Sequence, residues 1–367
     1  MEKNFGEEPR REEESQQVPV PEVREKSQED RVLDWFDKIK AAEINVDIDK
    51  IKEMFSTDEP AQHRTIEREK KEKKRYKLMD IAQCMAGLDS DRAWKMREEL
   101  LGEGVPEGWI VIGLAGVDSD RAWEMREKLV EKKPTFKGSK FYEFGHVAES
   151  LIGLDSEQAW EMREKLIGKN PRAVAESLIG LDSEQAWEMR EKIKTLAWKD
   201  KREYHVGSVE LEDFGTSVAH GIAYSLSGLD SDRAWQMREE IAQAASADRR
   251  AVYHWLDKWT PAELDVGGVA GLDSERAWEL REKWLRNGDT GRVAGSLAGV
   301  DSDRAWEMRE RFLKEGMPGF AVSSLVLDSD RAWQMIERIE KEYPRFVAIG
   351  SINNSTDLGI KMAKKNK

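Results

Sequence analysis

An aspartate, a tryptophan and an arginine recur at fixed spacing along the chain, in phrases such as GLDSEQAWEMREKI from Gly180. A guanidinium can bind a phosphate or carboxylate through two parallel hydrogen bonds, and it stacks on aromatic rings. The recurring aspartates are Asp89, Asp118, Asp155, Asp182, Asp230, Asp273, Asp301 and Asp328. The tryptophans are Trp94, Trp123, Trp160, Trp187, Trp235, Trp278, Trp306 and Trp333. The motif arginines are Arg97, Arg126, Arg163, Arg190, Arg238, Arg281 and Arg309. They form either a ladder that binds an anionic ligand or a set of internal structural contacts.

The helical period favours the structural interpretation of the motif arginines. On a wheel of 100° per residue, Ala186, Trp187, Arg190 and Ile193 fall on one side, and the acidic residues fall on the other. The eighth copy has Ile336 at the arginine position. A buried arginine must be paired, so we expect each to contact a motif aspartate of its own or an adjacent repeat and to stack on the motif tryptophan.

Other candidates for chemistry are sparse. The histidines His63, His146, His205, His220 and His254 have no recurring carboxylate or serine partner. Cys84 is the only cysteine, which excludes an intramolecular disulfide and a zinc site made of thiolates. Neither a phosphate-binding glycine-rich loop nor an HExxH motif occurs, and the Asp-Ser-Asp runs lack the later ligands of a calcium loop. We therefore expect no catalytic residues, no metal and no cofactor.

The spacing of the motif predicts the fold. Eight copies follow one another with a basic period of about 27 residues, interrupted by three insertions. A period of 20 to 50 residues with helical patterning is typical of a solenoid. We expect an all-α, right-handed solenoid of eight short helix–turn–helix repeats.

Each unit should contain a short helix, a glycine turn and a longer helix. Pro171 suits the first turn of the short helix, and Gly180 suits a left-handed residue that ends it. Ser183, beside Asp182, is expected to cap the longer helix.

The chain divides into four expected segments. Residues 1–30 are predicted to be disordered, 31–77 to form a helical cap and basic linker, 78–345 to form the solenoid, and 346–367 to be a segment with a basic tail. The insertions predict a loop over 132–144, a possible short hairpin over 195–215 and an amphipathic helix over 252–259. Their aromatic residues either pack on the repeats or anchor a partner: Trp255, Trp259, Phe141 and Tyr142.

Composition narrows the classes of partner. The formal net charge of −13 disfavours a general nucleic-acid or anionic-membrane binder, because both need dense positive charge. The chain has no apolar run near the roughly 20 residues of a membrane helix, and its first residues lack the apolar core of a secretory signal. A cytoplasmic location is expected.

The short-helix, long-helix rhythm resembles α-solenoid repeats of the HEAT type. The unit AVAESLIGLDSEQAWEMREKL from Ala173 also resembles the repeat of transcription-activator-like effectors in helix lengths and in the turn. In that family the turn residues read DNA bases, which implies that role for the turn pairs Ala86-Gly87, Ala115-Gly116, Ile152-Gly153 and Ile179-Gly180. Here these pairs are mostly apolar and hardly vary, and the insertions break a fixed rise per base.

Two functions remain as expectations. The first is a non-enzymatic scaffold that binds a protein partner on its extended surface. The alternative is a nucleic-acid binder that uses the motif arginines, the basic stretch 64–77 and the basic tail from Lys361. An enzyme carried in the 195–215 insertion has no positive support.

Overall fold

The computed structural model describes residues 27–41, 59–132, 139–199, 212–247, 268–322 and 329–343. Within these ranges all regular structure is α-helical and there is no strand, which confirms the all-α class. None of the helices in this part of the chain has both the length and the apolar character required to cross a membrane.

Each copy of the motif forms one helix, which we call a motif helix. The motif helices are α4 (Asp91–Gly102), α6 (Asp120–Glu131), α8 (Glu157–Ile167), α10 (Glu184–Lys199), α12 (Asp232–Ala247), α14 (Glu275–Arg286), α16 (Asp303–Lys314) and α18 (Asp330–Glu342).

A second set of helices precedes the motif helices. These are α5 (Glu107–Ile112), α7 (Ser139–Glu149), α9 (Pro171–Glu176), α11 (Glu212–Ser225), α15 (Thr290–Ser296) and α17 (Pro318–Val322). The chain before them forms α1 (Gln28–Ala41) and the long helix α3 (Glu59–Cys84), whose last turns precede the first motif.

Local signals mark the helix ends, although the serines before α6, α8, α14, α16 and α18 make no side-chain cap hydrogen bond. Ser90 has extended backbone angles, and its hydroxyl accepts a hydrogen bond from the amide of Ala93 at 3.0 Å. Pro171 is the first residue of α9. Gly180 has a φ of 78°, a left-handed conformation that costs glycine nothing, and the motif glycines of six other copies share it.

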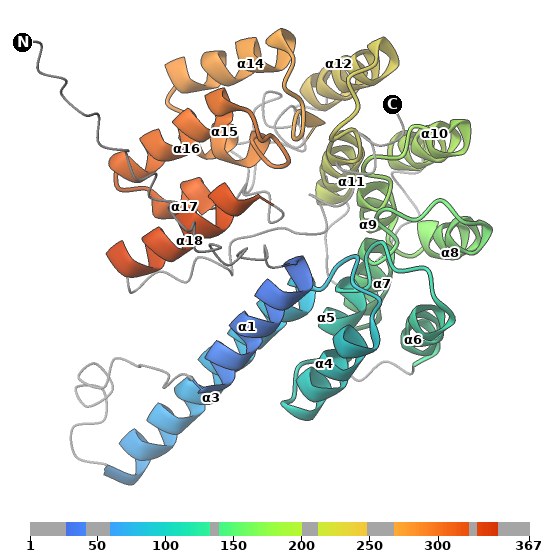
Figure 1. Cartoon of the computed structure of the whole chain (residues 1–367). Helices are drawn as coiled ribbons and strands as arrows, with labels where there is room; N and C mark the ends of the chain where they lie inside the picture. The colour runs from blue at the N-terminus through green and yellow to red at the C-terminus, as the bar shows by residue number, and fades with distance from the viewer. Residues whose placement is uncertain are drawn as a thin grey trace, which may run out of the picture.

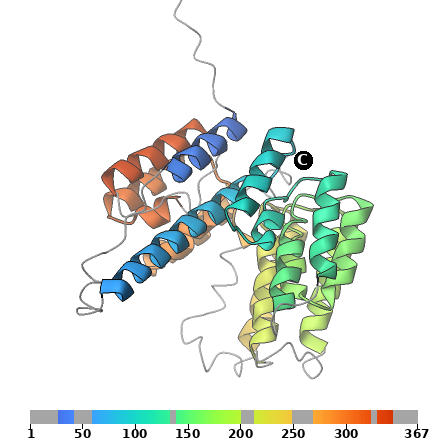
Figure 2. The same cartoon turned by 90° about the horizontal axis from the view of Figure 1, so that it is seen from below.

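The helices lie in two layers along a curved path (Figure 1). From α5 to α12 the preceding helices lie on the inner side and the motif helices on the outer side. Along the inner layer α5 packs between α3 and α7, and α9 packs between α7 and α11. Adjacent turns are also joined through the backbone, because the amide of Gly87 donates to the carbonyl of Ala115 at 2.7 Å and that of Gly116 to Ile152 at 2.8 Å. The view from below shows α1 beside α18, although the two helices lie at opposite ends of the described chain (Figure 2).

The structure corrects three expected boundaries. The predicted loop over 132–144 is helical from Ser139, because Phe144, Val147 and Leu151 continue a helical spacing toward the core. The first residues of the 195–215 insertion, where a hairpin is expected, belong to α10, which ends at Lys199. Its last residues belong to α11, which begins at Glu212. The segment expected to be disordered reaches into α1, which begins at Gln28.

Several predictions lie outside the described residues. These are the rest of the N-terminal segment, the remainder of the first two insertions, the predicted helix over 252–259 and the C-terminal segment from 344.

Candidate functional site

The motif tryptophans are buried between successive repeats. The side chain of Trp187 is 2% exposed, and all eight tryptophans are buried. The indole Nε1 of Trp187 donates to the carboxylate of Asp182 at 2.9 Å, and the same bond forms in each of the first seven copies. The aspartate five residues before the tryptophan therefore fixes the orientation of the ring.

The motif arginines are also buried, but their partners are main-chain oxygens. Arg163 donates from one terminal nitrogen to the carbonyls of Leu151 at 2.8 Å, Leu154 at 2.9 Å and Ser177 at 3.1 Å. Its Nε donates to the hydroxyl of Ser177 at 3.0 Å. Its guanidinium lies 4.5 Å from the ring centre of Trp160. Since Ser177 belongs to the next repeat, the guanidinium joins two repeats, and we call this arrangement the arginine staple.

The staple recurs along the chain. Arg126, Arg190 and Arg281 each donate to the hydroxyl and to the carbonyl of a serine in the following repeat. Arg97 and Arg238 donate instead to the carbonyl of a glycine, Gly113 and Gly268 respectively. A serine does not fit at Gly113, because a Cβ there would lie 2.0 Å from the carbonyl oxygen of Ala82.

The predicted pairing of motif arginine with motif aspartate is therefore wrong. The carboxylate of Asp118 accepts from the indole of Trp123 and from the hydroxyl of Ser156 in the next repeat, whereas Arg126 is bonded to serine and carbonyl oxygens. The carbonyls at the end of a helix carry partial negative charge, which favours a cation there. Burial lowers the pKa of Arg163 to about 9, so the guanidinium stays charged at neutral pH.

The end of the array explains the substitution in the eighth copy. The six staples from Arg97 to Arg281 each take an acceptor from the repeat that follows, and residues 344–367, which follow α18, contain no further copy of the motif. Ile336 fills the arginine position there and is fully buried. An apolar side chain needs no acceptor, so burying it costs no hydrogen bond.

A second arginine lies on the outer surface. In six copies the second residue of the motif helix is an arginine, which we call the ladder arginine. Arg331 forms an ion pair with Asp303 of the preceding repeat at 2.8 Å and lies 5.2 Å from the ring centre of Trp306. Arg121, Arg233, Arg276 and Arg304 likewise pair with a carboxylate of the preceding repeat. Most motif tryptophans from the fourth copy onward thus lie between a buried and an exposed guanidinium.

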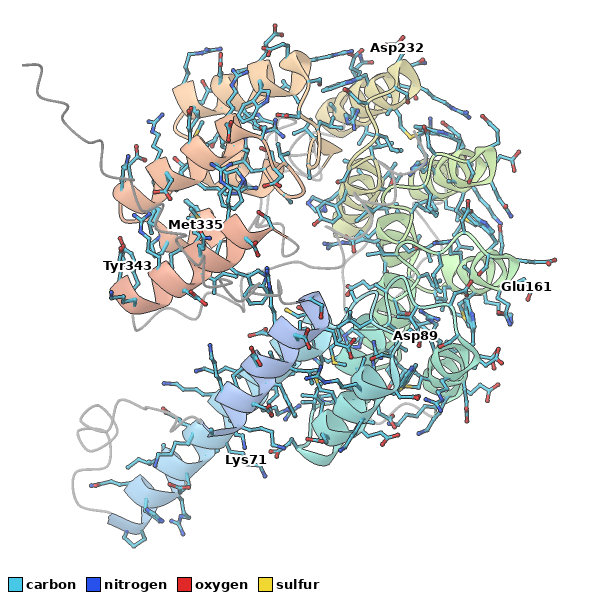
Figure 3. The ribbon with its side chains drawn as sticks, viewed as in Figure 1. Lys71, Asp89, Glu161, Asp232, Met335 and Tyr343 are labelled. Atoms are coloured by element: carbon cyan, nitrogen blue, oxygen red, sulfur yellow. The ribbon has the colours of Figure 1, made fainter. Side chains whose placement is uncertain are left out.

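The ladder is interrupted in the third and fourth copies, where glutamine takes its place as Gln158 and Gln185. The surrounding carboxylates are exposed, and Glu161 lies on the outer side of α8 (Figure 3). We define the acidic face as the exposed carboxylates of α6, α8 and α10, which are Asp120, Glu124, Glu127, Glu131, Glu157, Glu161, Glu164, Glu184, Glu188 and Glu191. The outer surface of α14, α16 and α18 differs, because there ladder arginines pair with carboxylates.

A row of basic side chains lies on α3. Arg64, Arg68, Lys71 and Arg75 are exposed and are spaced four, three and four residues apart, which places them on one side of the helix. We call these four residues the basic stripe. Figure 3 shows Lys71 on the part of α3 that extends away from the repeats.

The described histidines and Cys84 are the remaining candidates for chemistry. Burial lowers the pKa of His220 to about 4 and also lowers that of His146, so both imidazoles are neutral at pH 7. His63 is exposed, and His205 and His254 lie outside the described residues. Burial raises the pKa of the Cys84 thiol to about 12, which makes it a poor nucleophile. In the described part of the chain no group of three or more histidines, cysteines and carboxylates could hold a metal ion.

The aromatic residues proposed as partner anchors are placed only in part. Tyr142 on α7 is 64% exposed. The side chain of Phe141 and the residues Trp255 and Trp259 lie outside what the structure describes. A shared role of these four residues in binding a partner therefore stays a prediction.

Comparisons with known proteins give no relative: no family model matches the chain, and no significant match was found among curated proteins or solved structures.

Proposed function

We propose that this chain is a non-enzymatic helical-repeat scaffold that binds a basic protein partner on its acidic face. In this proposal the eight units, with their period of about 27 residues, form a right-handed solenoid whose inner contacts are structural and whose outer surface is available for binding. The function rests on charge and shape rather than on a reactive group.

The burial of the motif arginines supports this proposal. Arg126, Arg163 and Arg190 are fully buried, and their donors point to carbonyl and serine oxygens of the repeats themselves. They cannot reach a phosphate without dismantling the joint between two repeats. The exposed groups on α6, α8 and α10 are mainly carboxylates, of which Glu164, Glu184 and Glu191 form ion pairs with Lys192, Arg233 and Lys194.

The observation that carries the choice of a basic partner is the loss of the ladder arginine at Gln158 and Gln185. Elsewhere this arginine neutralises a carboxylate of the preceding repeat. The exposed carboxylates Asp120 and Glu157 are each followed, one repeat later, by a neutral glutamine instead of this arginine. Complementary potentials speed the encounter of two proteins and select the partner of opposite charge.

A pair of matched variants tests this proposal. Glu161→Gln with Glu188→Gln removes two charges from the acidic face. Glu279→Gln with Glu307→Gln removes two charges from the same motif position on α14 and α16, and all four side chains are exposed. A partner captured by the full chain from extracts of its own cells should bind the first variant about tenfold more weakly and the second almost unchanged. Equal affinities for the two variants would remove the acidic face as the binding surface.

The basic stripe supports a second candidate, binding of an anionic polymer such as a nucleic acid. The sequence predicts such binding through the motif arginines, the basic stretch 64–77 and the basic tail. Because the motif arginines are buried, the basic stripe of α3 is the described part of these residues that a nucleic acid could reach. Phosphate contacts of this kind weaken steeply with salt.

The two candidates predict opposite results in one experiment. Arg68→Gln with Lys71→Gln should abolish a nucleic-acid interaction and leave a partner of the acidic face bound. Capture that survives nuclease treatment but depends on Glu161 and Glu188 supports the protein-binding function. Capture lost on nuclease treatment, or sensitive only to the α3 variant, supports the alternative.

A further inference from the structure

Helix α1 lies at the gap between the end of the array and its beginning. In Figure 1 the motif helices follow the curved path from α4 to α18, and α1 lies between these two. An array of repeats leaves an unpaired face at each end, which must be covered. The contacts of α1 show that one helix covers both faces.

The sequence of α1 is a degenerate copy of the motif helix. Its run DRVLDWFDKI, from Asp30, aligns with DRAWKMREEL, from Asp91, on the shared Asp-Arg pair. The buried side chains of α1 are Val32, Phe36 and Ile39. The aligned buried residues of α4 are Ala93, Arg97 and Leu100. Helix α1 therefore presents the same face to the core as a repeat helix does.

Toward α18, α1 makes the contacts of a following repeat. Arg31 forms an ion pair with Asp330, and its guanidinium lies 5.7 Å from the ring centre of Trp333. The ladder arginine Arg331 makes the equivalent pair of contacts with Asp303 and Trp306 one repeat earlier. Arg31 is thus a ladder arginine in position and in partners.

Toward α4, α1 makes the contacts of a preceding repeat. Asp30 accepts from the ladder arginine Arg92 at 2.8 Å, as Asp91 accepts from Arg121 one repeat later. The carboxylate of Glu29 accepts from the hydroxyl of Ser90, a bond of the same kind as that from Ser119 to the motif aspartate Asp89, although Glu29 lies one position later in the alignment.

The buried positions at both joints have changed together. Phe36 takes the place of a motif arginine in α1, and Cys84 takes the serine position of the first repeat that would accept from it. At the other joint Ile336 takes the arginine position. All three side chains belong to one apolar cluster, which includes residues of α1 and of α18. Apolar packing has replaced the polar staple at the two joints that α1 makes.

We propose that α1 is a displaced ninth motif helix that docks between the last and the first repeat and closes the array into a ring. The docking surface is formed by the sides of α18 and α4 that face no other motif helix, and its occupant is the α1 segment of the same chain. Closure of the ring by α1 does not depend on the partner proposed above.

Zero-length cross-linking of the full chain tests the closure. A carbodiimide joins a lysine to a carboxylate in direct contact, and Lys40 of α1 already lies 3.0 Å from Glu99 of α4. Arg31→Lys provides the matching probe for Asp330. A closed ring gives both cross-links in the monomer. The Lys40 cross-link alone would show that α1 is a simple N-terminal cap and would overturn closure, and a 31–330 cross-link confined to dimers would show that α1 is exchanged between two copies.

A second variant separates closure from a chance contact. Phe36→Asp places a charge in the apolar joint, whereas Asp37→Asn changes an exposed residue of the same helix. We expect Phe36→Asp to abolish the 31–330 cross-link and to produce concentration-dependent oligomers, because an open array exposes two complementary ends that can join head to tail. Retention of the cross-link and of the monomer in Phe36→Asp would contradict the proposal.

Discussion

Replacing Arg190 by alanine tests whether the motif arginines hold adjacent repeats together. The guanidinium donates to the carbonyls of Leu178, Leu181 and Ser225 at 2.8, 2.9 and 2.9 Å, and Nε donates to the hydroxyl of Ser225 at 2.9 Å. It also lies 4.7 Å from the ring centre of Trp187. The side chain thus contributes contacts to its own repeat and to the next one.

The size of the effect follows from two opposing terms. Each hydrogen bond to a charged group contributes about 1.5–3 kcal/mol. Burial opposes the charged form, since it lowers the pKa of Arg190 from 12.5 to about 9, which is equivalent to about 5 kcal/mol. The three carbonyls share the two hydrogens of one terminal nitrogen, and the other terminal nitrogen is buried without a hydrogen-bond partner, so the bonds and the cost of burial largely offset each other. Alanine would remove the guanidinium donor from these carbonyls and leave a cavity beside Trp187. We expect Arg190→Ala to lower the free energy of unfolding by about 3–5 kcal/mol.

Arg233 provides the matched control, because it lies 4.6 Å from the same Trp187 ring but at the surface, paired with Glu184. Arg233→Ala should cost less than about 1 kcal/mol. Arg190→Ile, which copies the eighth repeat, should cost less than Arg190→Ala because it fills the cavity. Urea denaturation followed by tryptophan fluorescence measures these losses, and hydrogen exchange in α10 and α11 reports the joint itself, since repeat arrays can unfold in stages.

The result that would refute this reasoning is an Arg190→Ala variant that is as stable as Arg233→Ala. In that case the buried bonds would contribute no more than an exposed ion pair. If the same variant also lost binding to an anionic ligand, the motif arginines would be ligand-binding residues rather than structural contacts.

Three further changes test other parts of the structure. Trp187→Ala should cost about 3–5 kcal/mol in urea denaturation, because the ring is buried and anchors the repeat to Asp182, and a loss below about 1 kcal/mol would mean that the ring does not pack as described. Burial raises the pKa of Glu149 to about 7, so the folded chain binds more protons than the unfolded chain between pH 4.5 and 7, and this group makes the protein less stable as the pH rises through that window. Glu149→Gln should therefore gain about 1–3 kcal/mol at pH 8 relative to the native chain and nothing at pH 4, as thermal melts at the two pH values would show. Gly113→Ala should be destabilising because of the close carbonyl of Ala82, whereas Gly168→Ala, with no atom within 4 Å of its Cβ, serves as the tolerated control.

The sequence alone determined the helical class, the ends of the repeat helices and the face that each motif helix buries. Caps such as Ser90, left-handed glycines such as Gly180 and the spacing of Ala186, Trp187 and Ile193 act within a few residues, so their effect can be read locally. The bond between indole and aspartate also joins residues at a constant separation of five, but the sequence does not show that the aspartate pairs with the tryptophan rather than with the arginine.

Only the tertiary structure decided how the repeats are joined. The staple reaches 14 residues along the chain from Arg163 but 24 from Arg126 and 35 from Arg190, because the insertions fall within the joints. The number of residues between arginine and acceptor is not constant, and most of the acceptors are carbonyls, which every residue carries. The contact between Arg31 and Asp330 spans 299 residues and forms only because the curved array returns to its beginning. Residues close together in the sequence decide where each helix begins and ends. The acceptors of a buried arginine are decided by tertiary packing, because they depend on which helix end lies next to the guanidinium.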